Sequence, residues 1–292
     1  MSRKPALLAS VIALAVTSPA FAGSSAPAPN ASAAASQAEG GGQTHGGAQA
    51  QGGVQAKSPA KPAPSKATPE QRAEAERLDP LGRAAFWARE VDVDPRDAEA
   101  HIKLAKALRA LGRYDEAAAN ADQVLVMTPT NLEALLESAR ARVAANEGFY
   151  AIDDAERAEA IAPRDWRPLA LLAVALEQSD RDSEALAAHQ KALALAPDNP
   201  ATLTNLGMYY AAHGDPARAE PLLRKAAAEP GAAAQERQNL ALVLGLEGRF
   251  DEAEQLERHD LPPQAVENNL AYLRADAAPP HARTWDSLKT SP

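Results

Sequence analysis

Apolar residues recur along most of the chain with the 3.6-residue period of an amphipathic helix. Each periodic stretch is followed by a short turn and by a second, alanine-rich stretch that stops near a proline. The prolines Pro95, Pro129, Pro163 and Pro197 are evenly spaced with a period of about 34 residues, and Pro230 follows at nearly the same interval. Periods of this size indicate supersecondary units stacked in series.

The same residue types return at the same positions of each unit. The first helix carries an apolar face, formed by the sets Leu104/Ala105/Leu108, Leu135/Ala139/Val143, Leu172/Ala173/Leu176, Leu206/Gly207/Tyr210 and Leu240/Ala241/Leu244. The turn carries residues that tolerate a left-handed backbone after a helix, namely Gly112, Asn146, Asp180, Gly214 and Gly248. The second helix carries a small residue where the two helices should cross, at Ala117, Ala151, Ala185, Ala219 and Ala253. The pattern also predicts that a second helix comes close at Gly207.

A unit of about this length with this pattern resembles the tetratricopeptide repeat. The resemblance implies an all-α superhelix of about five stacked helix-turn-helix repeats, with flanking helices, over residues 70–276. One hairpin cannot bury its apolar face alone, so stability should come from the interfaces between neighbours. The 46% hydrophobic and only 4% aromatic content fits closely packed, alanine-rich helices better than a β-sandwich.

Both flanks of the repeats carry helix signals. Thr68, Pro69 and Gln71 form the pattern of a capping box at the start of order. After a second cap at Asp79, a helix over 81–91 is expected to turn five residues inward: Leu81, Ala84, Ala85, Ala88 and Val91. A last helix over 264–274 is expected to cap the final hairpin through Val266, Leu270 and Leu273.

The two ends of the chain differ in composition from the repeats. Residues 1–22 have the charged start, short apolar run and small-residue cleavage pattern of a secretory signal, which predicts cleavage after Ala22 and export; an uncleaved anchor is the alternative. Residues 23–69 are rich in Ala, Gly, Ser and Pro and predict a disordered linker. The tail over 277–292 is also expected to be disordered, with Trp285 either incidental or a docking residue. The sequence has no cysteine, so it is not expected to be a lipoprotein.

Charge and candidate chemistry argue against several functions. The formal net charge is -9, and the acidic residues concentrate after residue 69, which disfavours nucleic-acid binding. Asp153-Asp154 and Asp251-Glu252 are expected at the starts of second helices, where carboxylates suit the helix dipole. The histidines show no metal-ligand spacing, and no serine has the flanks of a nucleophile elbow. We therefore expect no catalytic residue, no metal, no cofactor and no small-molecule substrate.

Binding of another protein is the remaining function. In a stack of this kind the first helices line the inner, concave surface. Ten residues are predicted to face it as a peptide-binding groove: Lys103, Lys106, Arg109, Arg140, Arg167, Asn205, Met208, Gln238, Asn239 and Leu242. Positive charge gathers at the N-terminal end of this line, and Asn205 and Asn239 hold the same repeat position. An acidic or C-terminal segment of a partner is the expected ligand; ordinary solvated helix faces are the alternative.

Four stretches outside the generic repeat positions carry a narrower resemblance: residues 79–90, 107–114, 237–250, and 260–263 followed by 267–274. They resemble the TadD-like tetratricopeptide repeat proteins of the tight-adherence (Flp/Tad) pilus assembly system. The resemblance implies a periplasmic accessory factor, with the pilus secretin or another component of that machine as partner and membrane association only through partners. A general periplasmic adaptor for another cell-envelope complex is the alternative.

Overall fold

The structure is a computed structural model that describes residues 65–277. The described helices belong to one compact unit of the chain; of a second unit, Pro19–Ser65, only Ser65 is described. The predicted signal, most of the predicted linker and all but the first residue of the predicted tail, Trp285 included, lie outside the described residues.

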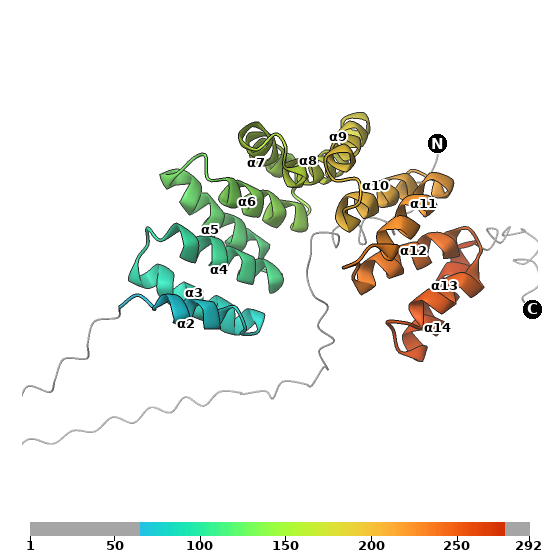
Figure 1. The fold of residues 1–292 in the computed structure, drawn as a ribbon, viewed down its shortest axis with the longest axis horizontal. Helices are drawn as coiled ribbons and strands as arrows, with labels where there is room; N and C mark the ends of the chain where they lie inside the picture. Colours follow the sequence, from blue (N-terminus) through green and yellow to red (C-terminus); the bar gives the residue numbers. More distant parts are fainter. Residues whose placement is uncertain (1–64, 278–292) are drawn as a thin grey trace, which may run out of the picture. The chain divides into compact units, whose positions relative to one another are not determined.

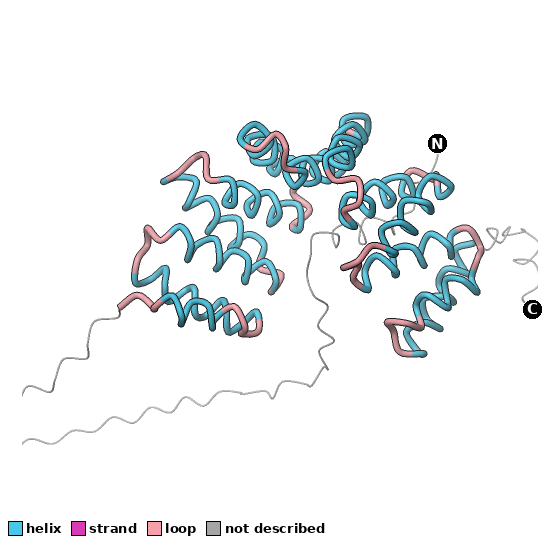
Figure 2. Tube along the Cα trace, viewed as in Figure 1, coloured by secondary structure: helices cyan, strands magenta, loops and turns pink. Residues whose placement is uncertain are grey.

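Residues 65–277 form helices joined by short turns and contain no strand (Figures 1 and 2). Two helices precede the repeats, α2 (Pro69–Ala75) and α3 (Pro80–Val93). The first helices of the five repeats, called A helices below, are α4 (Ala98–Ala110), α6 (Leu132–Ala144), α8 (Trp166–Gln178), α10 (Pro200–Ala212) and α12 (Ala234–Leu246). The second helices, called B helices, are α5 (Tyr114–Met127), α7 (Gly148–Ile161), α9 (Asp182–Leu195), α11 (Pro216–Ala228) and α13 (Phe250–Glu257). The last helix is α14 (Pro263–Ala277).

The repeats stack in the order of the sequence. Each A helix packs against its own B helix and against the A helix of the next repeat, and each B helix also contacts the following A helix. α14 packs on α12 and α13 in the place of a further A helix, so it covers the end of the stack. The predicted all-α repeat architecture is therefore confirmed.

Local signals fix the C-terminal end of every A helix and the N-terminal end of the first four. Asp97, Asn131, Asp165 and Asn199 cap the first four A helices through their side-chain oxygens. The predicted turn residues all adopt positive φ: Gly112, Asn146, Asp180, Gly214 and Gly248. In each turn the next backbone N–H reaches back to a carbonyl of the A helix, as in Arg113 to Leu108 at 2.9 Å. These bonds satisfy carbonyls that the helix end would leave unpaired.

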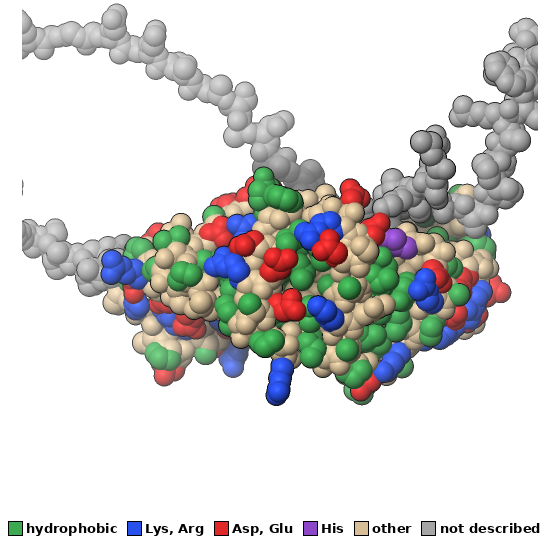
Figure 3. Space-filling view, turned by 90° about the horizontal axis from the view of Figure 1, so that it is seen from above, with side chains coloured by type: hydrophobic (Ala, Val, Ile, Leu, Met, Phe, Trp, Pro, Cys, Tyr) green, Lys and Arg blue, Asp and Glu red, His purple; other side chains and the backbone are tan. Residues whose placement is uncertain are grey.

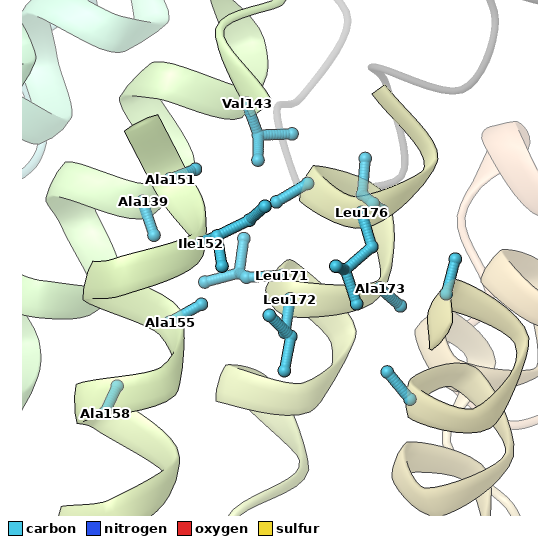
Figure 4. Packing of buried hydrophobic residues seen from close by; sticks show 14 of the residues in the cluster. Ala139, Val143, Ala151, Ile152, Ala155, Ala158, Leu171, Leu172, Ala173 and Leu176 are labelled. Atoms are coloured by element: carbon cyan, nitrogen blue, oxygen red, sulfur yellow. The ribbon is translucent and has the colours of Figure 1, made fainter. Parts of the chain in front are cut away.

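Small side chains let the helices approach closely. The five predicted alanines of the B helices, from Ala117 to Ala253, are fully buried. Figure 4 shows Ala151, Ala155 and Ala158 of α7 beside Ile152, whose side chain points toward Leu171 and Leu172 of α8. Each large aliphatic residue buried in this way contributes about 1.5–3 kcal/mol.

The buried face of α3, the helix before the repeats, differs from the predicted one. Leu81 is 66% exposed and Ala85 is exposed, whereas Trp87 and Glu90 are buried. Glu90 turns inward because its carboxylate accepts hydrogen bonds from the backbone N–H of Ala67 at 3.0 Å and from Arg72 at 2.8 Å. The buried face of α3 is thus set by α2 and the segment before it, not by apolar residues alone.

The other flanking predictions are confirmed. Thr68 and Gln71 form the capping box of α2, and Asp79 caps α3. At the far end, Val266, Leu270 and Leu273 of α14 are buried.

Candidate functional site

The ten residues of the predicted groove all lie on A helices, on what we call the A-helix face. Lys103, Lys106 and Arg109 lie on α4, Arg140 on α6 and Arg167 on α8; Asn205 and Met208 lie on α10, and Gln238, Asn239 and Leu242 on α12. The structure divides this set into a charged half on α4, α6 and α8 and an amide half on α10 and α12.

Glu137 of α6 is the centre of the charged half. Its side chain is fully buried, and it accepts a hydrogen bond from Arg109 Nε at 2.6 Å and a longer one from Arg140 Nη1 at 3.4 Å. Burial lowers the pKa of Arg140, and the charges of Arg109 and Arg167 act in the same direction. The three groups hold one another in place across the boundary between the first two repeats.

Glu133 forms a second ionic link, one turn earlier on α6. It accepts a hydrogen bond from Arg167 Nη1 at 2.9 Å and lies 3.6 Å from Lys106 Nζ. Burial would raise the pKa of Glu133, but the bond and the charge of Arg167 outweigh it and the pKa is lowered. Arg167 also binds Asp165 at 2.6 Å, the residue that caps α8.

Pairing changes the predicted electrostatics of the charged half. Lys103 binds Glu76 at 3.0 Å, so every one of the five predicted cations has a carboxylate within 4 Å. Figure 3 shows the same interspersion on the face that it presents, where acidic and basic side chains lie beside one another. Sequence reasoning found the cations but missed Glu133 and Glu137. Glu137 occupies in the second repeat the position that Lys103 occupies in the first. This equivalence could have shown that an acidic residue lies among the predicted basic residues of the groove.

The amide half is built differently. Asn205 and Asn239, at the same position of successive repeats, are 8% and 2% exposed. Asn205 makes no side-chain hydrogen bond to any residue that the structure describes, yet its amide atoms are not fully enclosed. Asn239 Oδ1 accepts from Gln235 Nε2 at 3.1 Å, and its Nδ2 has no partner within 65–277. A largely buried amide without a partner is costly to keep, and it can donate to and accept from a peptide backbone.

The other three predicted groove residues lie close to the core. Met208 is 3% exposed and belongs to the cluster that α10 forms with α11 and α12. Leu242 packs against the same cluster, and Gln238 is half-buried. Met208 is therefore part of the core and does not line a groove, contrary to the prediction, because its side chain packs between α10, α11 and α12.

The paired carboxylates divide between two settings. Asp251 and Glu252 lie in the first turn of α13, as predicted. Asp153 and Asp154 do not lie at a helix start, because α7 already begins at Gly148. Asp154 is buried, accepts from Ser138 Oγ at 2.8 Å and pairs with Arg142; burial raises its pKa. Its contacts join α6 to α7 and do not serve the helix dipole.

The described histidines make structural contacts. His101 Nδ1 lies 3.0 Å from Asn120 Oδ1, and His189 Nε2 lies 2.5 Å from Glu177 Oε1. Within residues 65–277 no three His, Asp or Glu side chains are grouped as metal ligands. In the same part of the chain, no helix combines the length and the apolar character that crossing a bilayer requires.

Comparison with known proteins places the repeats in a family. Residues 98–131, 169–201 and 201–228 each match a model of the tetratricopeptide repeat. The structure of TTC0263, a tetratricopeptide repeat protein of Thermus thermophilus, is similar at 23% identity over 61% of this chain and 99% of that chain, with a TM-score of 0.55. A tetratricopeptide repeat protein from Parabacteroides merdae ATCC 43184 is similar at 12% identity over 70% of this chain and 80% of that one, with a TM-score of 0.58. A search among curated proteins gives no match.

The fold and the A-helix face define an α-helical repeat protein whose extended surface is typical of scaffolds for protein–protein interaction. Three of the five repeats match models of the tetratricopeptide repeat, and the stack has the fold of a tetratricopeptide repeat superhelix. At these identities the similar structures show the fold alone.

Proposed function

We propose that this protein is a non-enzymatic, periplasmic scaffold that binds an extended segment of a partner protein on its A-helix face. We further propose that it serves the assembly of a Flp/Tad-type pilus secretion machine, with the secretin as the first candidate partner. The proposal has two parts, a binding mode and a cellular role, which rest on different observations.

The pair of amides at Asn205 and Asn239 carries the binding mode. Two side chains at one repeat position keep hydrogen-bonding capacity that no described residue fully uses. An extended backbone presents a donor and an acceptor at each residue, and both can be met by a side-chain amide. Neighbouring repeats thus offer two anchoring points along one bound segment.

The charged half supports an acidic segment more weakly than the sequence suggests. The cations of α4, α6 and α8 are paired, and Lys106 has the most exposed side chain among the five, at 40%. Its contact with Glu133 is also long, at 3.6 Å, and solvent screens such a pair. A carboxylate of the partner can therefore compete for Lys106 without breaking the buried bonds of Glu137.

The cellular role rests on the sequence. The stretches 79–90, 107–114, 237–250, and 260–263 followed by 267–274 resemble TadD-like proteins, and residues 1–22 resemble a cleaved export signal. The similar solved structures carry no argument for or against this role.

Binding is tested with the variant Lys106→Glu/Asn205→Ala in pull-downs with the periplasmic part of the secretin. We expect binding to weaken by about tenfold, the equivalent of about 1.4 kcal/mol, while a cooperative melting transition shows that the variant is folded. Lys191→Glu, an equal charge change at an exposed position of α9, is the matched control and should bind like the wild type. Binding of the folded double variant as tight as that of the wild type would show that the A-helix face is not the binding site.

The role and the location are tested in cells. Deletion of the gene should reduce assembled secretin and pili, and the double variant should not restore them. Alkaline phosphatase fused after residue 69 should be active only if the export signal works. Normal pili in the deletion strain, with binding to another envelope complex, would instead favour the general adaptor.

A further inference from the structure

A second candidate surface lies on the B helices, away from the A-helix face. Val126, near the end of α5, is 78% exposed; Phe149 and Tyr150, in the first turn of α7, are 75% and 64% exposed. The rings of Phe149 and Tyr150 meet edge to face, with centroids 5.5 Å apart. Tyr150 and Val126 line one hollow, so the three side chains form a continuous patch, which we call the α5–α7 patch.

The other repeats show that the fold does not require these apolar residues. At the positions of Phe149 and Tyr150 they carry the pairs Asp115/Glu116, Ser183/Glu184, Ala217/Arg218 and Asp251/Glu252. At the position of Val126 they carry Ala160, Ala194 and Ala228. In three repeats the glutamate binds an arginine at the helix start: Arg113–Glu116, Arg181–Glu184 and Arg249–Glu252. In the second repeat, Glu147 and Tyr150 replace both partners of that pair.

The hollow beside the patch has a volume of about 410 Å³ and an acidic excess. At its base Arg142 binds Asp154 and, at 2.8 Å, Asp122. At its rim Arg157 lies 3.3 Å from Asp153, whose side chain is 78% exposed. Three carboxylates face two guanidinium groups, so the lining carries one net negative charge.

We propose that the α5–α7 patch docks a segment of a partner protein that presents a lysine or arginine flanked by aliphatic residues. The cation would lie in the hollow near Asp122 and Asp153, with its methylene stem against Tyr150 and Val126. The aliphatic neighbours would cover Phe149. Exposed aromatic side chains beside a charged pocket are the usual anchors of a protein interface.

Charge decides among the possible occupants. An anionic membrane surface would be repelled by the acidic excess of the hollow. A second copy is disfavoured because the chain has a net charge of -9. A basic segment is complementary to the hollow.

The test restores the residues that other repeats carry. The variant Val126→Ala/Phe149→Asp/Tyr150→Glu should melt like the wild-type chain, because the three side chains are 78%, 75% and 64% exposed and bury little apolar surface. Tyr150→Glu alone serves if the triple variant does not fold. Leu195→Ala is the matched control, since Leu195 is a 41% exposed apolar residue of α9 outside the patch.

The probe is a library of dodecapeptides with aliphatic flanks and a central Lys, Gln or Glu, applied to the full chain. We expect central-Lys peptides to bind the wild type and the Leu195 variant at least about tenfold more tightly than the triple variant. Asp153→Asn should weaken the preference for Lys over Gln.

Three results would overturn the proposal. One is equal binding of every peptide to the wild type and the triple variant, and another is selection of central-Glu peptides. The third is loss, in the triple variant, of wild-type dimerisation in sedimentation or of wild-type binding to anionic phospholipid vesicles.

Discussion

Gly207 offers a direct test of how closely the helices of one hairpin approach. A Cβ added there would lie 2.8 Å from Leu223 Cγ and 3.0 Å from Leu223 Cδ2. Leu223 is fully buried, so it cannot swing into solvent to make room. Overpacking of this kind costs about 1–3 kcal/mol.

Two effects compete in Gly207→Ala. Alanine gains about 1 kcal/mol over glycine inside a helix. The clash with Leu223 exceeds that gain, so we expect a net loss of about 0–2 kcal/mol and a melting temperature lower by up to about 8 °C. Gly207→Leu adds three further carbons with no space for them and should lose about 3 kcal/mol or more.

Thermal and urea unfolding of a double-mutant cycle separates the two effects. In a Leu223→Ala background the clash is gone, so Gly207→Ala should stabilise the protein by about 1 kcal/mol. Gly82→Ala is a control, because its Cβ would meet the exposed Leu78 at 3.2 Å and Asp79 Oδ1 at 3.7 Å but no buried side chain. Equal effects of Gly207→Ala in the two backgrounds would refute the role of Gly207 as a helix-crossing position.

Three further predictions concern other helix ends and buried charges. Glu257 has a buried oxygen without a partner among the described residues, and burial raises its pKa above 4.5. The carboxylate therefore destabilises the fold only above that pH, and Glu257→Gln should add about 1 kcal/mol at pH 7 and nothing near pH 4, measured by urea unfolding. Burial would raise the pKa of Asp97, but Arg72 and a backbone N–H lower it to about 2. Its contribution of about 1–2 kcal/mol should be lost as the pH falls from about 4 to 2, and Asp97→Asn should flatten that part of an acid-unfolding curve. Asn146→Gly, at a φ of 62°, should raise the stability by up to about 1 kcal/mol in thermal unfolding.

The repeat and its turns could be predicted because their causes are local. A left-handed residue such as Asn146 and a small residue such as Ala151 act within one hairpin, and their counterparts return in every repeat. α3 was less predictable, since the burial of Glu90 depends on Arg72 and on the N–H of Ala67, which fold back from earlier in the chain. The prediction from apolar periodicity that Leu81 faces inward is wrong, because Leu81 is exposed.

The helices that carry the candidate residues could be predicted, but the ion pairs of these residues could not. Periodicity places Lys106 and Arg109 on one helix face. It does not show that Glu133 and Glu137, from the next repeat, come within bonding distance once the repeats stack. The sequence did not reveal the α5–α7 patch, because large apolar residues such as Phe149 and Tyr150 are usually buried in a core. Only the fold shows that both side chains are exposed.

Site-specific crosslinking tests the central claim, that the A-helix face holds the partner. The chain has no cysteine, so single cysteines can carry a photo-crosslinker without side reactions. Lys106→Cys and Gln238→Cys label the charged half and the amide half of the A-helix face. Lys191→Cys labels α9, a B helix. With the periplasmic part of the secretin, we expect crosslinks from Lys106→Cys and Gln238→Cys and none from Lys191→Cys. Equal yields at the three positions, or a crosslink from Lys191→Cys alone, would contradict the claim.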